Sequence, residues 1–134
     1  MEKMPEKEEE WKKKLSAEQF AVLRQKKTEA PFTGRLLHEK RNGKYICAGC
    51  GSELFSSETK FDSGTGWPSF SNPENTAKIE IVEDYTEGMR RKEAICKKCK
   101  GHLGHVFDDG SAEMGGKRYC VNSCALKFRN KEDA

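Results

Sequence analysis

The chain has 134 residues, of which 34% are hydrophobic and 35% are charged, so its length suits one domain with a thin apolar core. Its 25 basic and 22 acidic residues leave a net charge of only +3, which disfavours an obligate polyanion such as nucleic acid as a partner. The opening stretch MEKMPEKEEEWKKK has no apolar run and predicts neither a signal peptide nor a membrane span, so no membrane association is expected.

The first 30 residues predict two short helices. Pro5 opens a run rich in Glu and Lys in which Trp11 and Leu15 lie four residues apart, as on one face of a helix. Ser16 and Gln19 have the spacing of a capping box for a second helix, which ends before Pro31. We expect residues 1–30 to form a helical arm that packs on a sheet.

From residue 34 onward the pattern is that of antiparallel strands. A first hairpin is predicted for residues 35–40 and 44–48, with its turn at Asn42-Gly43. A second hairpin is predicted for residues 78–85 and 89–96, and further strands for 104–110 and 117–123. Residues 55–76 show little periodicity and are interpreted as a functional loop. The prediction is one mainly β domain over 1–134, with its β core at 34–128.

Two CxxC units predict a metal site. Cys47 and Cys50 follow one predicted strand, Cys96 and Cys99 follow another, and glycine comes soon after each pair. Four thiolates in a tetrahedral array close the coordination of zinc, so such a site is structural. A thioredoxin-like redox pair is the rival interpretation, but it needs a βαβ context and a single CxxC, and neither is found here.

A second group of residues surrounds Cys120. Alternation along a strand places Cys120 on one face with Arg118 and Asn122, where the cation lowers the thiol pKa and the amide can hold a ligand. His102 and His105 form an HxGH unit directly after the second CxxC pair and supply groups that titrate near neutral pH. The alternatives are that Cys120 is a small buried apolar residue and that the histidines are further zinc ligands.

Trp67 lies in the glycine-rich stretch FDSGTGWPSF, residues 61–70. An aromatic ring in such a loop can hold a small apolar group, and a methyl group on sulfur would suit it. The alternative is a tryptophan that only anchors the packing of the loop.

Four stretches in this order, CAGCG, FDSGTGWPSF, CKKCKGHLGHVFDDG and GKRYCVNSCALKF, resemble the B-type methionine sulfoxide reductases. The resemblance extends from about residue 11 to residue 128. It implies two antiparallel β-sheets with short N-terminal helices and one structural zinc ion, bound by Cys47, Cys50, Cys96 and Cys99. It also implies a peptide-methionine (R)-S-oxide reductase, an oxidoreductase that repairs oxidised proteins through a sulfenic acid intermediate.

The resemblance implies a role for each remaining site residue. Cys120 is expected to be the nucleophile, and the ring of Trp67 is expected to receive the methyl group of the substrate. His102 and His105 are expected to polarise or protonate the sulfoxide oxygen. Asn122 and Arg118 are expected to support the site, and Asp109 is expected to orient a histidine.

Regeneration of Cys120 is where this sequence departs from the family pattern. Many members carry a recycling cysteine at the position that Thr65 fills here. An external thiol is therefore expected as reductant: thioredoxin, glutaredoxin or a small thiol. Cys124 is a candidate resolving cysteine, but two Cα atoms four residues apart on an extended strand lie about 13 Å apart, so a disulfide requires a turn at Asn122 or Ser123.

Two other classes of function compete with the reductase. One is a non-catalytic zinc-binding β-module that binds a protein or a ligand, which has no need of Cys120, the two histidines and Trp67. The other is a thiol oxidoreductase acting on disulfides, which depends on Cys124 as a second thiol. The expected state is a monomer in the cytoplasm, or in an organelle if a targeting segment has been removed.

Overall fold

The structure is a computed structural model that describes residues 8–73, 76–85, 88–110, 112 and 115–131. Pro5, the expected start of the first helix, lies outside these residues. The described helices are α1 (Glu8–Lys14) and α2 (Ala17–Gln25). The described strands are β1 (Gly43–Cys47), β2 (Glu53–Ser56), β3 (Lys60–Phe61), β4 (Ser69–Phe70), β5 (Ile79–Asp84), β6 (Arg91–Cys96), β7 (His102–Phe107), β8 (Arg118–Val121) and β9 (Leu126–Asn130).

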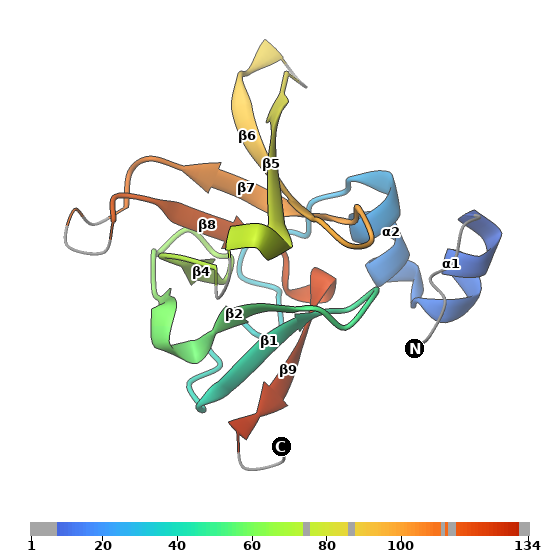
Figure 1. The fold of residues 1–134 in the computed structure, drawn as a ribbon, viewed down its shortest axis with the longest axis horizontal. Coiled ribbons are helices and arrows are strands. Elements are labelled where there is room, and N and C mark those ends of the chain that lie inside the picture. The colour runs from blue at the N-terminus through green and yellow to red at the C-terminus, as the bar shows by residue number, and fades with distance from the viewer. Residues whose placement is uncertain (1–7, 74–75, 86–87, 111, 113–114, 132–134) are drawn as a thin grey trace.

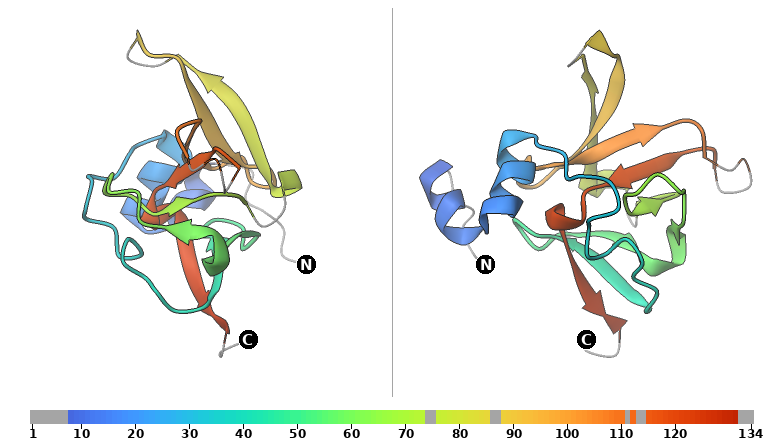
Figure 2. Two further views of the ribbon diagram at one scale, coloured as in Figure 1. Left: turned by 90° about the vertical axis from the view of Figure 1, so that its left-hand side faces the viewer. Right: turned by 180° about the vertical axis from the view of Figure 1, so that it is seen from behind.

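The strands form two antiparallel sheets, which confirms the predicted fold class. A three-stranded sheet has the order β2-β1-β9, and a six-stranded sheet has the order β3-β4-β8-β7-β6-β5. The predicted second hairpin is present as β5 and β6, which pair without interruption from Ile79↔Cys96 to Asp84↔Arg91. Figures 1 and 2 show this hairpin projecting from the rest of the protein.

Aromatic side chains fill the space between the two sheets. Phe55 on the small sheet stacks on Phe70 of the large sheet, with ring centroids 4.4 Å apart. Tyr45 meets the edge of Phe70 at 5.0 Å, and Tyr119 approaches Phe55 at 5.9 Å. All four side chains are buried. Because each ring removes a large apolar area from water, this cluster compensates for the low share of apolar residues in the chain.

The N-terminal arm packs against the large sheet and the second CxxC turn. The capping box is present, because Gln19 N–H donates to Ser16 Oγ and the Gln19 side chain accepts from Ser16 N–H. Arg24 of α2 donates to the carbonyl of Cys99 at 2.8 Å and lies over the ring of buried Trp11. The arm therefore covers one side of the cysteine cluster.

The predicted first hairpin is wrong in its first half. Residues 35–40 form successive turns, held by bonds from Leu37 N–H to Gly34 O and from Glu39 N–H to Leu36 O. The strand after Asn42-Gly43 is β1, and its two edges pair with β2 and β9. Since both edges of β1 are occupied, residues 35–40 have no edge on which to form a strand. Periodicity alone does not reveal that β9, some 80 residues later, takes this place.

The unpatterned stretch 55–76 contains more regular structure than we predicted. The end of β2, a 3-10 turn (Ser57–Thr59), and strands β3 and β4 all lie within it. Strands β3 and β4 have two residues each, which is too short to show an alternating pattern in the sequence. In the part of the chain that the structure describes, no helix combines the length and the apolar character needed to cross a bilayer.

Candidate active site and metal site

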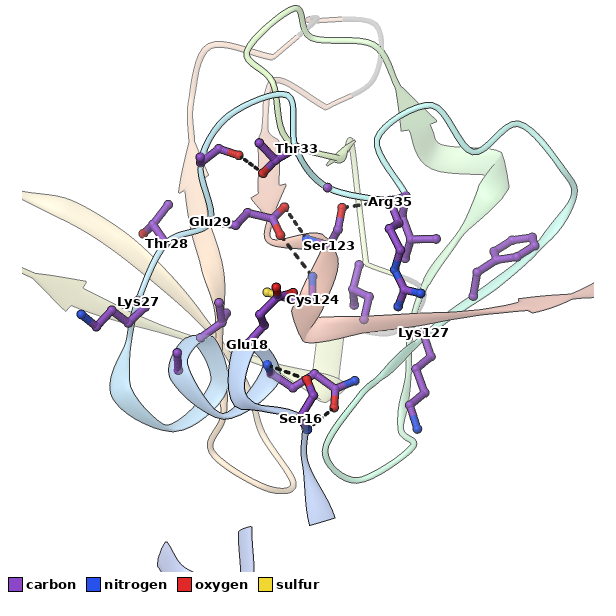
Figure 3. Close-up of a pocket in the computed structure, with 18 of the residues that line it drawn as sticks. Ser16, Glu18, Lys27, Thr28, Glu29, Thr33, Arg35, Ser123, Cys124 and Lys127 are labelled. Carbon is purple, nitrogen blue, oxygen red and sulfur yellow. Dashed lines mark hydrogen bonds between the residues drawn. The ribbon is translucent and has the colours of Figure 1, made fainter. Parts of the chain in front are cut away.

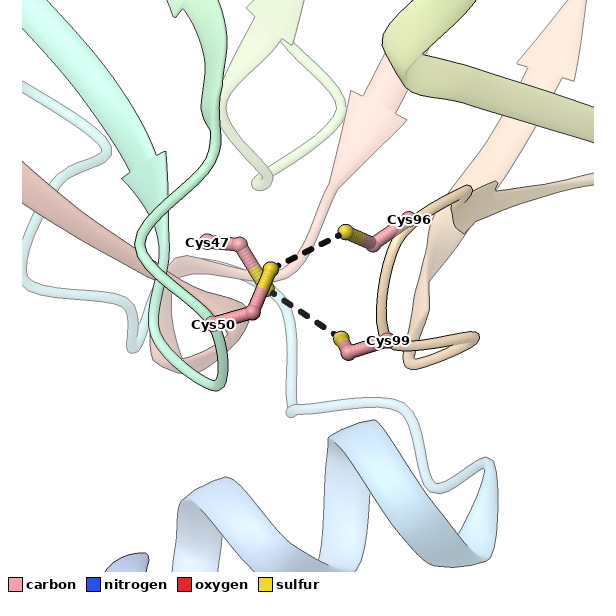
Figure 4. A group of neighbouring side chains, drawn as sticks. All are labelled: Cys47, Cys50, Cys96 and Cys99. Atoms are coloured by element: carbon pink, nitrogen blue, oxygen red, sulfur yellow. Dashed lines mark hydrogen bonds between the residues drawn. The ribbon is translucent and has the colours of Figure 1, made fainter. Parts of the chain in front are cut away.

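The four cysteines of the CxxC units meet at one point (Figure 4). Their sulfur atoms all lie within 4.8 Å of one another, with Cys47 3.7 Å from Cys99 and Cys50 3.5 Å from Cys96. Three of the four side chains are buried. Four thiolates this close repel one another strongly unless a cation lies between them. The cluster is therefore positioned to bind a metal ion.

The two CxxC turns come from different sheets. Cys47 ends β1 of the small sheet, and Cys96 ends β6 of the large sheet. Each turn is closed by a backbone bond onto its first cysteine, from Gly51 N–H to Cys47 O and from Lys100 N–H to Cys96 O. A metal bound here would join the two sheets.

Cys120 lies in a row of residues that runs across the large sheet. Its direct neighbours are Ser69 on β4 and His105 on β7, and His105 in turn is opposite Glu93 on β6. Residues directly opposite in antiparallel strands point to the same face, with Cβ atoms about 4.5–5.5 Å apart. The pairing thus places a thiol, an imidazole and a carboxylate side by side.

A β-bulge brings His102 to the same face as His105. Residues three apart on a regular strand point to opposite faces. The ladder between β6 and β7, however, passes from Ala94↔Gly104 directly to Ile95↔His102 and skips Leu103. The extra residue restores the parity, and the two imidazole rings meet edge-on at 5.5 Å. The bulge therefore allows the two histidines of the HxGH unit to lie side by side.

Gly104, the glycine of HxGH, lies against the strand that carries Cys120. A Cβ atom at this position would overlap the carbonyl oxygen of Cys120. Asn122, just beyond β8, uses both its backbone N–H and its side-chain amide to donate to Leu103 O at 3.0 Å. The lack of a side chain at Gly104 and the two hydrogen bonds to Leu103 O therefore keep β7 and β8 close together beside Cys120.

Each histidine of the pair has its own carboxylate partner. His102 Nδ1 lies 2.7 Å from Glu93 Oε2, and His105 Nε2 lies 2.9 Å from Asp84 Oδ2.

Asp109, which was expected to orient a histidine, is bound to an arginine in the structure. Both oxygens of Asp109 accept from the guanidinium of Arg118, at 2.9 and 3.1 Å. This ion pair lowers the pKa of Asp109 and raises that of Arg118.

The thiol of Cys120 is subject to opposing influences. Burial raises its pKa above the ordinary cysteine value, while the charge of Arg118 and hydrogen bonds from Thr65 and Arg118 lower it. Burial is the larger effect, so the net shift of the thiol pKa is upward. Thr65 thus contacts the thiol and favours its anionic form.

Replacing Thr65 by valine is expected to raise the pKa of Cys120 further, because the hydrogen bond to the thiolate is lost. Alkylation of Cys120 by iodoacetamide should slow by about threefold to tenfold near pH 7.5, and the difference should vanish at a pH above both pKa values. Mass spectrometry of the peptide that contains Cys120 measures the rate. Thr65→Ser keeps the hydroxyl and should behave as wild type; equal rates for Thr65→Val would contradict the assigned hydrogen bond.

Glu29, which follows α2, connects the parts of this site. Its backbone carbonyl accepts from Trp67 Nε1 at 2.9 Å, and its backbone N–H donates to Asn122 Oδ1 at 3.0 Å. Its carboxylate accepts the backbone N–H groups of Ser123 and Cys124, at 2.7 and 3.3 Å. One residue thereby holds both the indole ring and the amide expected to contact the substrate.

Cys124 lines a cleft of about 940 Å³ that does not include Cys120. The cleft is also lined by α2, residues 27–41 and β9 (Figure 3). The chain does leave the strand after Asn122, in the 3-10 turn Ser123–Ala125, so the turn that a disulfide requires is present. Burial and the nearby charge of Glu29, however, raise the pKa of Cys124 to about 12. The thiol is therefore kept protonated, which opposes a resolving role.

Comparison with known proteins decides the family. The SelR domain matches residues 15–130 of the chain. The chain belongs to the SelR family. It is 55% identical to the "Peptide methionine sulfoxide reductase MsrB" of Methanosarcina barkeri over 126 residues, which cover 94% of this chain and 88% of that protein. It is 53% identical to the protein of the same name from Bradyrhizobium diazoefficiens, over 92% of this chain and 88% of that protein. The resemblance to the B-type reductases is thus confirmed, and SelR membership makes the chain an oxidoreductase of this kind.

Sequence reasoning missed the acidic residues of this SelR site. Glu93 and Asp84 lie on strands with alternating charges and have the appearance of solvent-facing strand residues. Glu29 lies in a polar connection between a helix and a turn. A weak signal was available, since Glu93 directly precedes the apolar residues Ala94 and Ile95 in the sequence.

Proposed function

We propose that the protein reduces methionine R-sulfoxide in oxidised proteins or peptides to methionine. The observation that carries the proposal is the row across the large sheet in which Cys120 lies directly beside His105, with His102 brought alongside by the bulge. A zinc-binding module without catalytic activity has no use for this arrangement. Family membership supports the reductase over a module that only binds a partner.

The proposed chemistry needs one thiol and one proton carrier. The sulfur of Cys120 attacks the sulfoxide sulfur, the sulfur–oxygen bond breaks and the oxygen moves to Cys120, giving methionine and a cysteine sulfenic acid. The thiol proton ends on that oxygen, so the step balances without any other reactant. A neighbouring imidazole can carry the proton from thiol to oxygen. Cys120 is thereby oxidised while the methionine sulfur is reduced.

The remaining site residues have supporting roles in the proposal. Trp67, half-buried and fixed by its bond to Glu29, offers a ring face to the methyl group of the substrate. Arg118 favours the thiolate of Cys120, and Asn122 keeps β7 and β8 in contact beside it. Asp109, as the partner of Arg118, holds the guanidinium in place.

We propose that the metal in the cysteine cluster is Zn²⁺, one ion per chain. A tetrahedral zinc–thiolate site with metal–sulfur distances of about 2.3 Å has sulfur atoms about 3.8 Å apart. The two closest sulfur pairs, at 3.7 and 3.5 Å, fit this spacing. Four thiolates leave no open position for substrate, so the ion has a structural role.

An external thiol is proposed to regenerate Cys120. Two reductant thiols convert the sulfenic acid to the thiol, with formation of their disulfide and one water. Thioredoxin, glutaredoxin and small thiols all supply this chemistry. The absence of a cysteine at position 65 and the raised pKa of Cys124 both favour direct attack by the reductant.

The function is tested with peptides that carry either epimer of methionine sulfoxide, with dithiothreitol or thioredoxin as reductant. We expect turnover of the R epimer and at least about a hundredfold less of the S epimer. Cys124→Ser should retain wild-type turnover with both reductants, because its thiol is protonated. Loss of only the thioredoxin-driven turnover in Cys124→Ser would make Cys124 the resolving residue, and equal turnover of the two epimers would overturn the assigned stereochemistry.

A further inference from the structure

A fully buried carboxylate lies behind the histidine pair. The side chain of Glu93 is 1% exposed, and buried carboxylates are rare unless they are paired. Its Oε2 atom lies 2.7 Å from His102 Nδ1, and its Oε1 atom lies 3.0 Å from Lys26 Nζ at the end of α2. Glu93 thus joins a surface cation to a buried imidazole.

The other ring nitrogen of His102 has no hydrogen-bond partner among the described residues, although the residue is only 4% exposed. The bond to Glu93 fixes the tautomer, because a carboxylate accepts the proton on Nδ1 and leaves Nε2 as the bare nitrogen. His105 is bound in the opposite sense, with Nε2 on Asp84. A buried nitrogen without a partner costs free energy, and a bound substrate or its proton would relieve that cost.

We propose that Glu93 is a positioning residue for the reductase reaction: it holds His102 with a bare Nε2 in the active site and stabilises the imidazolium while His102 carries the thiol proton. This inference rests on the proposed function. Lys26 completes the arrangement by balancing the second carboxylate oxygen. Asp84 has the same relation to His105, so each imidazole has its own anion.

The charged groups around His102 predict how its titration should change when each of them is removed. The groups that face it are Glu93 on β6, Lys26 after α2, and His105 on its own strand, with Cys120 beyond on β8. Burial lowers the pKa of His102, the hydrogen bond and charge of Glu93 raise it, and the charges of His105 and Lys26 lower it. Removing Glu93 and removing Lys26 should therefore move its titration in opposite directions.

The test is ¹⁵N-edited NMR of the imidazole groups in the zinc-loaded protein. The chain has three histidines, so His102 is assigned from a His102→Gln spectrum. We expect protonated Nδ1 and bare Nε2 in the wild type. Glu93→Gln should move the titration of His102 to lower pH, and Lys26→Met, at an exposed side chain, should move it to higher pH. Glu80→Gln, which removes an exposed carboxylate paired with Lys100, is the matched control and should leave it unchanged.

Kinetics of the same variants separate positioning from folding. Glu93→Gln should lower kcat for the R epimer by about tenfold to a hundredfold with little change in KM, because the substrate contacts remain. A wild-type kcat, or a His102 titration that does not respond to either variant, would overturn the proposal. If Glu93→Gln fails to fold, Lys26→Met tests the proposal by itself: the titration of His102 must move to higher pH. An inactive wild type whose NMR titrations behave as stated would refute the reductase function and leave the Glu93–His102 pairing standing.

Discussion

Cys120→Ser is expected to abolish reduction of the R-sulfoxide, lowering single-turnover yield and kcat by more than about a thousandfold. A serine hydroxyl at this position is not ionised at any pH near neutral, and it cannot accept the sulfoxide oxygen to form a sulfenic acid. The fold should be unaffected, because Cys120 is only half-buried and serine is nearly isosteric. Methionine release, measured by chromatography with dithiothreitol in excess, is the readout.

The control for this variant is Cys124→Ser, the same chemical change four residues away in the chain. A sulfenic acid probe adds a second measurement, since it should label wild-type Cys120 after one turnover without reductant and should not label Cys120→Ser. Retained activity in Cys120→Ser would refute the assignment of the nucleophile. It would also mean that the position of Cys120 beside His105 in the large sheet has no catalytic role.

Removal of the metal is expected to unfold the protein. The binding of zinc to such cysteine sites contributes about 10–16 kcal/mol of apparent free energy, whereas the total stability of a domain is about 5–15 kcal/mol. The effect should be large here because the ion joins β1 of one sheet to β6 of the other. Titration with a strong chelator, followed by circular dichroism and by metal analysis, should show loss of metal and loss of structure together.

Cys96→Ser tests the same point without a chelator, and Cys124→Ser is again the matched control. We expect Cys96→Ser to bind less than one metal per chain and to melt at a much lower temperature. A metal-free protein with an unchanged melting temperature would show that the aromatic core between the sheets is sufficient for the fold.

Local signals in the sequence were reliable where a short stretch determines its own structure. The capping box at Ser16, the β5–β6 hairpin and the gathering of the two CxxC units are all present. The strand predicted over residues 35–40 is wrong because the edges of β1 belong to β2 and β9. That competition is decided by pairing across most of the chain, which no local pattern records.

The same distinction holds for the candidate site. Residue types at fixed spacing predicted Cys120, the two histidines and the four CxxC cysteines as candidates, and the structure brings each of these groups together. The partners of the histidines were not identified, since Glu93 reaches His102 only through the bulge at Leu103, and a bulge leaves no mark in hydrophobic periodicity. Asp109 was expected from the family resemblance to orient a histidine, but its carboxylate accepts from the guanidinium of Arg118.

The pairing of β1 with β9 has a consequence for synthesis of the protein on the ribosome. The large sheet is composed of residues 60–121 and can form its hairpins while the chain emerges. The small sheet cannot be completed until Leu126–Asn130 has left the exit tunnel, because β9 supplies one whole edge of β1. Until then the ring of Tyr45 lacks the contact with Phe128 of β9. β9 thus closes the part of the core that β1 begins some 80 residues earlier, and a chain that has not yet reached β9 exposes aromatic surface that chaperones recognise.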